Sequence, residues 1–196
     1  GYRRIFQFYE EWKTSPLRVM ENSFDNSHFS FVHKANFGLF DQPAPAGYEF
    51  RETDYGFEAE TRVPIRNPEE SFRITGTREP ITQRHLINRY YLPFSRRFGC
   101  MYPDSGIHHI IYNCATPMED GRLMLVQWLY RNDSEEQCST QELIDWDAAI
   151  TAEVNAKVML SPQNREPQPA FRDDLALRRP DLAHRPRGIA VGQDVA

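Results

Sequence analysis

The stretch IHHIIYNCATPMEDGRLMLVQWLYRN, residues 107–132, decides the predicted fold. Two runs rich in aromatic and β-branched side chains, 107–117 and 122–132, flank the turn residues Glu119-Asp120-Gly121. Such runs, joined by a short link that contains glycine, are typical of two antiparallel strands in a hairpin. We therefore predict a β-hairpin here and expect the preceding sequence to extend it into a sheet.

The period-two pattern continues upstream as far as Tyr48. Residues 48–53 and 55–65 flank Asp54 and predict a second hairpin, and the runs 81–94 and 96–102 show the same enrichment in aromatic and β-branched residues. Short links favour antiparallel neighbours over crossover connections. The sequence therefore predicts one curved antiparallel sheet of six or seven strands.

Helical patterns flank this region on both sides. Residues 17–33 read as helix, whereas 4–13 are expected to form a short helix or an irregular segment. Residues 139–160 give the clearest helix, with Ser139 or Thr140 as its cap and apolar side chains at helical spacing. The predicted fold class is therefore α+β, with a helix pair, a sheet and a long closing helix.

Length and composition bound the classes of protein that fit. The 196 residues allow one domain, expected over 1–160, followed by a Pro- and Arg-rich extended tail at 161–196. The net charge of −5 gives no reason to expect nucleic acid as a partner, and no apolar run is long enough for a membrane helix. No signal peptide is visible, and three scattered cysteines without a CxxC pair are expected to be buried or half-buried thiols of a cytoplasmic protein.

The stretch ENSFDNSHFSFVH, residues 21–33, holds the candidate site. It places Asp25, His28 and His33 among apolar residues, which fits either a solvated helix face or a metal site. Two imidazoles and one carboxylate on one side of a metal suit non-haem Fe(II), whose open positions accept dioxygen. A regular helix would turn His28 and His33 about 140° apart, so their convergence requires a bent segment. Asp25 shares a face with His28 and can accept its second ring proton.

The same residues resemble a known family. Glu21-Asn22, Asp25, Ser27-His28, Phe31-Val32-His33 and Phe37-Gly38 are similar to the catalytic-domain signature of Rieske non-haem iron oxygenases. The similar branch is that of phthalate oxygenase and vanillate demethylase. The segments FYEEWKTSPLRVMEN (8–22) and CATPMEDGRLMLVQWLYRN (114–132) also resemble this branch, so the resemblance covers about residues 5–160.

The resemblance implies a helix-grip fold of the START/Bet v1 type, in which a curved sheet and a long C-terminal helix enclose a hydrophobic cavity. It implies that His28 and His33 ligate mononuclear Fe(II), and that Asp25 bridges to a Rieske [2Fe-2S] cluster on a neighbouring subunit. The implied partners are O2, a small hydrophobic or aromatic substrate, a reductase or ferredoxin, and further copies of the chain in a homotrimer. The implied reaction is hydroxylation, including aromatic ring hydroxylation, or oxidative demethylation by a monooxygenase or dioxygenase.

Two features depart from the family's pattern. A Rieske cluster needs C-x-H and C-x2-H pairs, which the three cysteines lack, so we expect either a C-terminal fragment or a cluster supplied by another chain. The family's third iron ligand is an aspartate on the closing helix, where this sequence has Val154. Glu153 is turned about 100° away from that position, although its longer side chain keeps it as a weaker candidate for the third ligand, and Asp147 lies about 10 Å along the helix. The alternative prediction is a catalytically silent helix-grip module, for ligand binding or assembly, that has lost its iron.

The remaining histidines carry weaker signals. His108 and His109 are consecutive in a predicted strand, so their rings face opposite sides of the sheet and one of them is a candidate for the cavity wall. His85 and His184 are expected to be structural or solvated. Neither a phosphate-binding glycine loop nor a nucleophile elbow occurs in the sequence.

Overall fold

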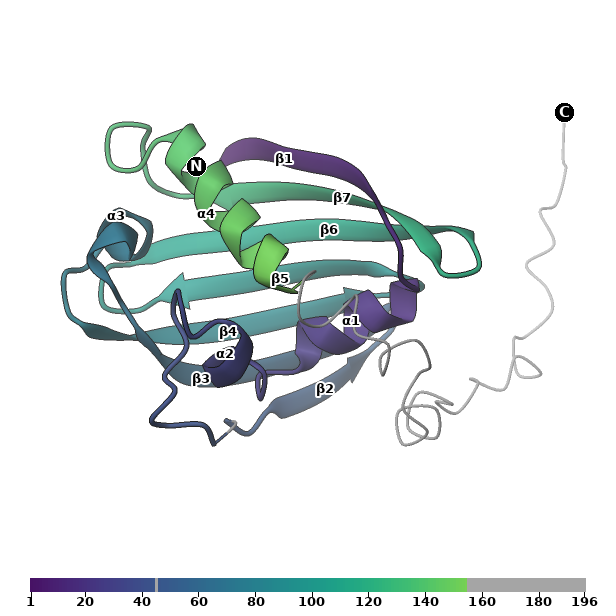
Figure 1. Cartoon of the computed structure of the whole chain (residues 1–196), viewed down its shortest axis with the longest axis horizontal. Helices are drawn as coiled ribbons and strands as arrows, with labels where there is room; N and C mark the ends of the chain where they lie inside the picture. Colours follow the sequence, from purple (N-terminus) through teal and green to yellow (C-terminus); the bar gives the residue numbers. More distant parts are fainter. Residues whose placement is uncertain (45, 155–196) are drawn as a thin grey trace, which may run out of the picture. The chain divides into compact units, whose positions relative to one another are not determined.

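The computed structural model describes residues 1–44 and 46–154. Seven strands form one antiparallel sheet in the order β1-β7-β6-β5-β4-β3-β2 (Figure 1). The strands are β1 (Arg3–Trp12), β2 (Glu49–Thr53), β3 (Gly56–Arg66), β4 (Ile81–Tyr91), β5 (Ser95–Tyr102), β6 (Ile107–Glu119) and β7 (Arg122–Arg131). The helices are α1 (Pro16–Phe24), α2 (Phe29–Val32), α3 (Phe72–Thr75) and α4 (Thr140–Val154), with a 3-10 turn η1 (Glu69–Ser71). The α+β class and the antiparallel sheet predicted from the sequence are confirmed.

The predicted hairpins lie where the turn residues placed them. β2 and β3 pair around residues 54–55, and β6 and β7 pair around Gly121. Gly106 and Gly121 have φ angles of 71° and 72°, a region that glycine enters without the steric penalty of a Cβ atom. These short turns keep neighbouring strands in register, so side chains from distant parts of the sequence line up in rows across the sheet.

The first strand corrects the sequence-based expectation. The prediction of a short helix or irregular segment over 4–13 is wrong, because β1 pairs with β7 from Arg3 opposite Arg131 to Trp12 opposite Leu123. The register shifts between Phe6 and Phe8. An extra residue at this point disturbs the alternation of buried and exposed positions by which a strand is recognised.

Two helices replace the single helix expected over 17–33. Ser15 caps α1, because its Oγ accepts a hydrogen bond from the backbone N–H of Arg18 at 3.3 Å. After α1, the Asp25 carboxylate accepts a hydrogen bond from the backbone N–H of Ser27 at 2.8 Å, which stabilises a turn. The chain therefore bends between α1 and α2, as the convergence of the two histidines requires.

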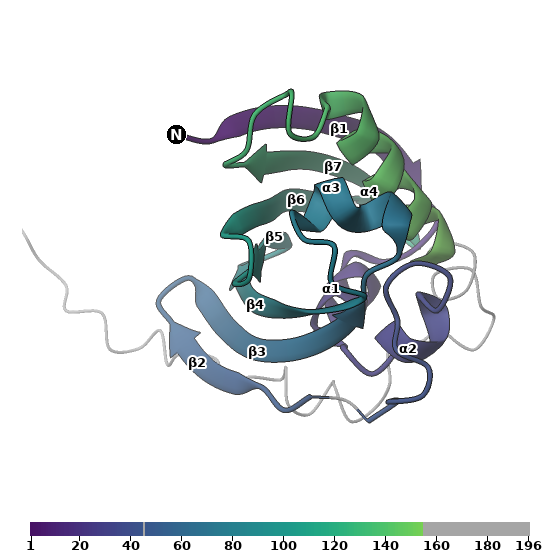
Figure 2. The ribbon, with the colours of Figure 1, turned by 90° about the vertical axis from the view of Figure 1, so that its left-hand side faces the viewer.

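The sheet curves, and α1, α2 and α4 lie on its concave side (Figure 2). Ser139 and Glu142 cap α4 reciprocally: Ser139 Oγ accepts from the Glu142 N–H at 3.2 Å, and Glu142 Oε2 accepts from the Ser139 N–H at 2.8 Å. Leu143 of this helix is fully buried in a cluster with Ile5 and Leu129. Such burial fixes α4 across β1 and β7.

The structure adds two further findings on the described residues. Cys100 and Cys138 are buried, Cys114 is half-buried, and all three are free thiols, as expected. None of the helices within 1–44 and 46–154 is long and apolar enough to cross a membrane. The last part of the predicted helix 139–160 and the predicted tail 161–196 lie outside the described residues.

Candidate active site

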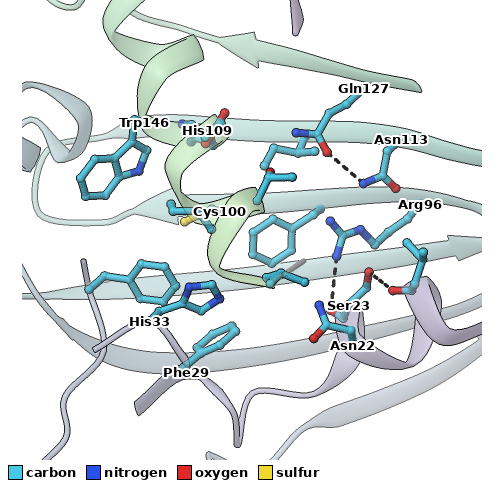
Figure 3. A pocket seen from close by; sticks show the side chains of 18 of the residues that line it. Asn22, Ser23, Phe29, His33, Arg96, Cys100, His109, Asn113, Gln127 and Trp146 are labelled. Atoms are coloured by element: carbon cyan, nitrogen blue, oxygen red, sulfur yellow. Dashed lines mark hydrogen bonds and ion pairs between the residues drawn. The ribbon is translucent and has the colours of Figure 1, made fainter. Parts of the chain in front are cut away.

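A cavity of about 150 Å³ lies between the concave face of the sheet and the helices (Figure 3). A cavity of that size is large enough for a benzene-sized molecule. Its walls include the aromatic side chains of Trp12, Phe29, Phe37, Phe98, Tyr102 and Trp146. They also include a polar set made up of Asn22, Ser23, His28, His33, Arg84, Arg96, His109, Asn113, Gln127, Asp147 and Thr151. The lining is thus more polar than the hydrophobic cavity expected from the sequence.

His28 and His33 both line this cavity, one on each side of the single turn α2. Their ring centroids lie 5.2 Å apart, with an angle of 60° between the ring planes. Two imidazoles that bind one metal ion through nitrogens about 2.1 Å from it have centroids about 5 Å apart. The separation of the two rings therefore suits a shared metal ion.

His33 is held from the opposite side by α4. Its Nδ1 lies 2.9 Å from Oε2 of Glu153, and the amide of Asn36 donates to the same oxygen at 2.7 Å. Burial lowers the pKa of His33 to about 4, although the hydrogen bond with Glu153 opposes this shift. His33 is therefore neutral at pH 7, and an Nδ1–H donated to the carboxylate leaves the lone pair on Nε2.

His28 has a similar but weaker arrangement. Its Nδ1 lies 3.4 Å from Oδ2 of Asp25, whose side chain is 45% exposed. Partial burial raises the pKa of Asp25, but hydrogen bonds from His28 and Ser27 outweigh that effect and lower the pKa to about 2. Both histidines thus face a carboxylate through Nδ1, the pattern by which proteins fix the orientation of metal-binding imidazoles.

Val154, which the family resemblance places where a third ligand is expected, has an apolar side chain. Val154 lines the cavity and packs on the buried cluster that includes Trp12 and Val19, so it faces inward as the helical spacing predicts. Asp147 hydrogen-bonds Gln7 and His109 instead of facing the two histidines. Within the described part of the chain, no group of three or more His, Cys, Asp and Glu side chains could hold a metal ion. Two imidazoles fit an iron site, and the described residues supply no third ligand.

His109 is the member of the His108-His109 pair that enters the cavity. Its Nε2 lies 3.1 Å from both carboxylate oxygens of Asp147, and its Nδ1 accepts from Arg131 at 3.2 Å. His108 lies on the other face of the sheet, where its ring stacks on Tyr2. Both ring nitrogens of His109 are therefore occupied, which gives this residue a structural role in the cavity wall.

A row of polar side chains crosses the cavity floor and was not found by the sequence reasoning. Arg96 on β5 lies opposite Asn113 on β6, and Asn113 lies opposite Gln127 on β7 (Figure 3). The Asn113 amide donates to Gln127 at 3.2 Å, and the Gln127 amide donates to Gln7 at 2.7 Å. Only the register of strands β5, β6 and β7 brings these residues together, and the sequence contains no short motif that signals it.

The fold is similar to that of several solved protein structures. Dicamba monooxygenase bound to 3,6-dichlorosalicylic acid matches with a TM-score of 0.68 at 17% identity, over 90% of this chain and 53% of that chain. The QL mutant of NdmA from Pseudomonas putida CBB5, with theobromine, matches with a TM-score of 0.61 at 17% identity, over 86% of this chain and 44% of that chain. The quaternary ammonium Rieske monooxygenase CntA with L-carnitine matches with a TM-score of 0.53 at 13% identity, over 87% of this chain and 41% of that chain. The shared property is the α+β fold, and this chain spans about half the length of these proteins.

The family follows from the sequence comparison. The family described as vanillate O-demethylase oxygenase C-terminal domain matches residues 12–187, which is most of the chain. This protein therefore belongs to that family. The predicted resemblance to the catalytic domain of Rieske oxygenases is confirmed. No curated protein sequence matches the chain.

Proposed function

We propose that this chain is the catalytic domain of a Rieske-type oxygenase, which binds mononuclear Fe(II) through His28 and His33. With O2, it hydroxylates or oxidatively demethylates a small organic molecule. The observation that carries the proposal is the pair of imidazoles 5.2 Å apart at one cavity, each with a carboxylate at Nδ1. Membership of the vanillate O-demethylase oxygenase family supports the reaction class.

The residues around the proposed iron site position its two histidine ligands. Nε2 of His28 and Nε2 of His33 would hold the ion, and iron bound there would supply the activation of O2. Glu153 and Asn36 keep His33 in one tautomer and orientation. Phe37 stacks on the His33 ring with centroids 4.7 Å apart and helps to exclude water. Because Val154 has no atom that could bind a metal, we expect weaker iron binding than three protein ligands would give.

We propose that Asp25 carries electrons to the site from a Rieske [2Fe-2S] cluster on a neighbouring subunit. Its carboxylate is 45% exposed and also contacts His28, so it lies between the protein surface and the cavity. In this proposal the cluster receives its electrons from a reductase or ferredoxin in the cytoplasm, and the subunits form a homotrimer.

A silent ligand-binding or assembly module remains the second candidate, because Val154 stands where a ligand is expected. Anaerobic titration with Fe(II), followed by metal analysis, separates the two. We expect wild type to bind about one iron per chain, His33→Ala to lose it and Val154→Asp to bind at least tenfold more tightly. His85→Ala is the matched control, because that histidine pairs with Glu60 outside the cavity. Absence of specific iron from both wild type and Val154→Asp would support the silent module.

A further inference from the structure

Arg96 differs from the other charged side chains of the cavity because no acidic side chain within 1–44 and 46–154 pairs with it. Among the described residues it makes one hydrogen bond, from Nη1 to the backbone oxygen of Ser23 at 3.4 Å, and its Nε is buried without a hydrogen-bond partner. Figure 3 shows Arg96 reaching from β5 toward Ser23 of α1, at the end of the cavity away from His33. Buried donors without an acceptor cost free energy, so this guanidinium has donors available for a ligand.

Arg96 lies 5.1 Å from the centre of the Phe98 ring, but no carboxylate of the described residues neutralises its charge. Burial lowers the pKa of Arg96 to about 10, against a smaller opposing effect of Tyr48, so the side chain is a cation at pH 7. Burial also raises the pKa of Tyr48 to about 12, which keeps that phenol neutral. Asp147, the carboxylate of the cavity wall, already accepts hydrogen bonds from His109 and Gln7.

The second arginine of the lining strengthens the positive potential. Arg84 lies 4.0 Å over the Phe37 ring and donates from Nε to the Tyr102 hydroxyl at 3.1 Å. The permanent charges among the lining residues are therefore two arginines against one aspartate. The carboxylates of Asp25 and Glu153 lie at the histidines, whereas the end of the cavity at Arg96 attracts an anion, and exclusion of water there strengthens the attraction.

Asn113 adds an acceptor beside these donors. It lies directly opposite Arg96 in the strand register, where side chains are about 5 Å apart at Cβ. Its Oδ1 is buried without a hydrogen-bond partner, while its amide nitrogen is used by Gln127. Arg96 and Asn113 thus present unused donors and an unused acceptor to the same part of the cavity.

From this arrangement, and resting on the proposed function, we propose that Arg96 determines substrate specificity by binding an anionic oxygen group, such as a carboxylate. Asn113 accepts a hydrogen bond from a donor on the same molecule. The cavity volume of about 150 Å³ limits the apolar body of the substrate to about one ring. The substrate is then a small anionic molecule whose charged end lies at Arg96 and whose body extends toward His28 and His33.

Binding of benzoate and of its neutral analogue benzamide tests this proposal in the full chain. The tryptophans in the lining, Trp12 and Trp146, provide a fluorescence signal beside calorimetry. We expect wild type to bind benzoate at least tenfold more tightly than benzamide, because a charge-assisted pair is stronger than a neutral one. Arg96→Gln should abolish the preference. Arg97→Gln is the matched control and should retain it, because the next residue of β5 points to the opposite face of the sheet.

Asn113→Asp tests the same subsite while Arg96 stays in place. The new carboxylate opposite Arg96 should pair with it and weaken benzoate binding at least tenfold, with circular dichroism showing that the variant is folded. The proposal is overturned if wild type binds benzamide as tightly as benzoate, if it binds neither probe, or if Arg96→Gln keeps the preference. These measurements need no iron. Loss of iron binding with an intact benzoate preference would therefore overturn the oxygenase and leave the anion subsite.

Discussion

Two arginines on the concave face of the sheet, Arg131 on β7 and Arg96 on β5, have opposite surroundings. Arg131 and its partner Asp133 have fully buried side chains, and Arg131 also donates to the Ile74 carbonyl at 3.0 Å and to His109 at 3.2 Å. Arg96 has one long hydrogen bond and an unpaired Nε. A buried cation whose three nitrogens all have partners belongs to the scaffold, whereas one with a buried, unpaired nitrogen has a donor available to a ligand.

The Arg131 network connects three parts of the chain that are distant in sequence. Arg3 of β1 also donates to Asp133 at 2.7 Å and to the carbonyl of Cys138 at 2.5 Å. Asp133 therefore holds β1, β7 and the segment before α4 together. Removing Asp133 would leave the fully buried Arg131 without a carboxylate, whereas Arg3 would keep its ion pair with Glu135. An unpaired buried cation is far more costly than the loss of a surface charge.

The largest expected effect on stability comes from removing Asp133 from this network. Asp133→Ala should lower the free energy of unfolding by about 3–5 kcal/mol, because it breaks a buried ion pair on one side. Urea unfolding followed by circular dichroism measures the change. A loss below about 1 kcal/mol would mean that the network contributes little and that the contrast between the two arginines does not hold.

The pH dependence of stability also tests the contribution of the Asp133 carboxylate. Burial raises the pKa of Asp133, but the hydrogen bonds from Arg131 and Arg3 outweigh it, so the folded pKa lies below the ordinary value. The stabilisation by this carboxylate is therefore present above about pH 4, the unfolded pKa, and is lost as the pH falls through the folded pKa. The difference in unfolding free energy between wild type and Asp133→Asn should narrow below pH 4. A constant difference between pH 3 and pH 7 would contradict this.

Replacing Arg96 should change the free energy of unfolding in the opposite direction. Arg96→Met replaces a buried, unpaired cation by an apolar side chain of similar length, so we expect the free energy of unfolding to rise by about 1 kcal/mol. Urea unfolding followed by circular dichroism measures this change in the free energy of unfolding. A loss of more than 1 kcal/mol would show that Arg96 stabilises the fold, as Arg131 does.

The smallest effect is expected at an exposed pair. Arg122 contacts Glu11 and Glu119 on the surface, with its own side chain 40% exposed. Arg122→Gln should leave the urea curve unchanged within error at 0.15 M salt, because solvent and ions screen such pairs. This variant also serves as the matched control for Asp133→Ala.

The sequence predicted the other strands of the sheet but not its first strand, β1. β4 and β7 alternate between buried and less buried positions over eleven and ten residues, and β3 does so over its last eight, so the period of two is visible in the sequence. β1 shows no such alternation, because the register shift at Gln7 interrupts it and several of its residues are exposed. Recognition of β1 required knowledge of its partner β7.

The site was predictable where its chemistry is local in sequence. His28 and His33 stand five residues apart, so a single stretch of sequence indicated them, and the structure brings their rings together. Arg96, Asn113 and Gln127 come from three strands, and their alignment depends on the register of two hairpins. A one-residue change in either register would turn these side chains to the other face, so sequence reasoning could not place them.

The pairing of β1 with β7 has a consequence for how the chain folds. Arg3 and Asp133, which meet at this edge of the sheet, are 130 positions apart. Contacts of such long range raise the contact order and slow folding, because much of the chain loses entropy before they form. During translation, β1 leaves the ribosome well before β7 and has to stay unpaired until then. The apolar face of β1 therefore needs protection from aggregation on the nascent chain, which is a situation in which chaperones act.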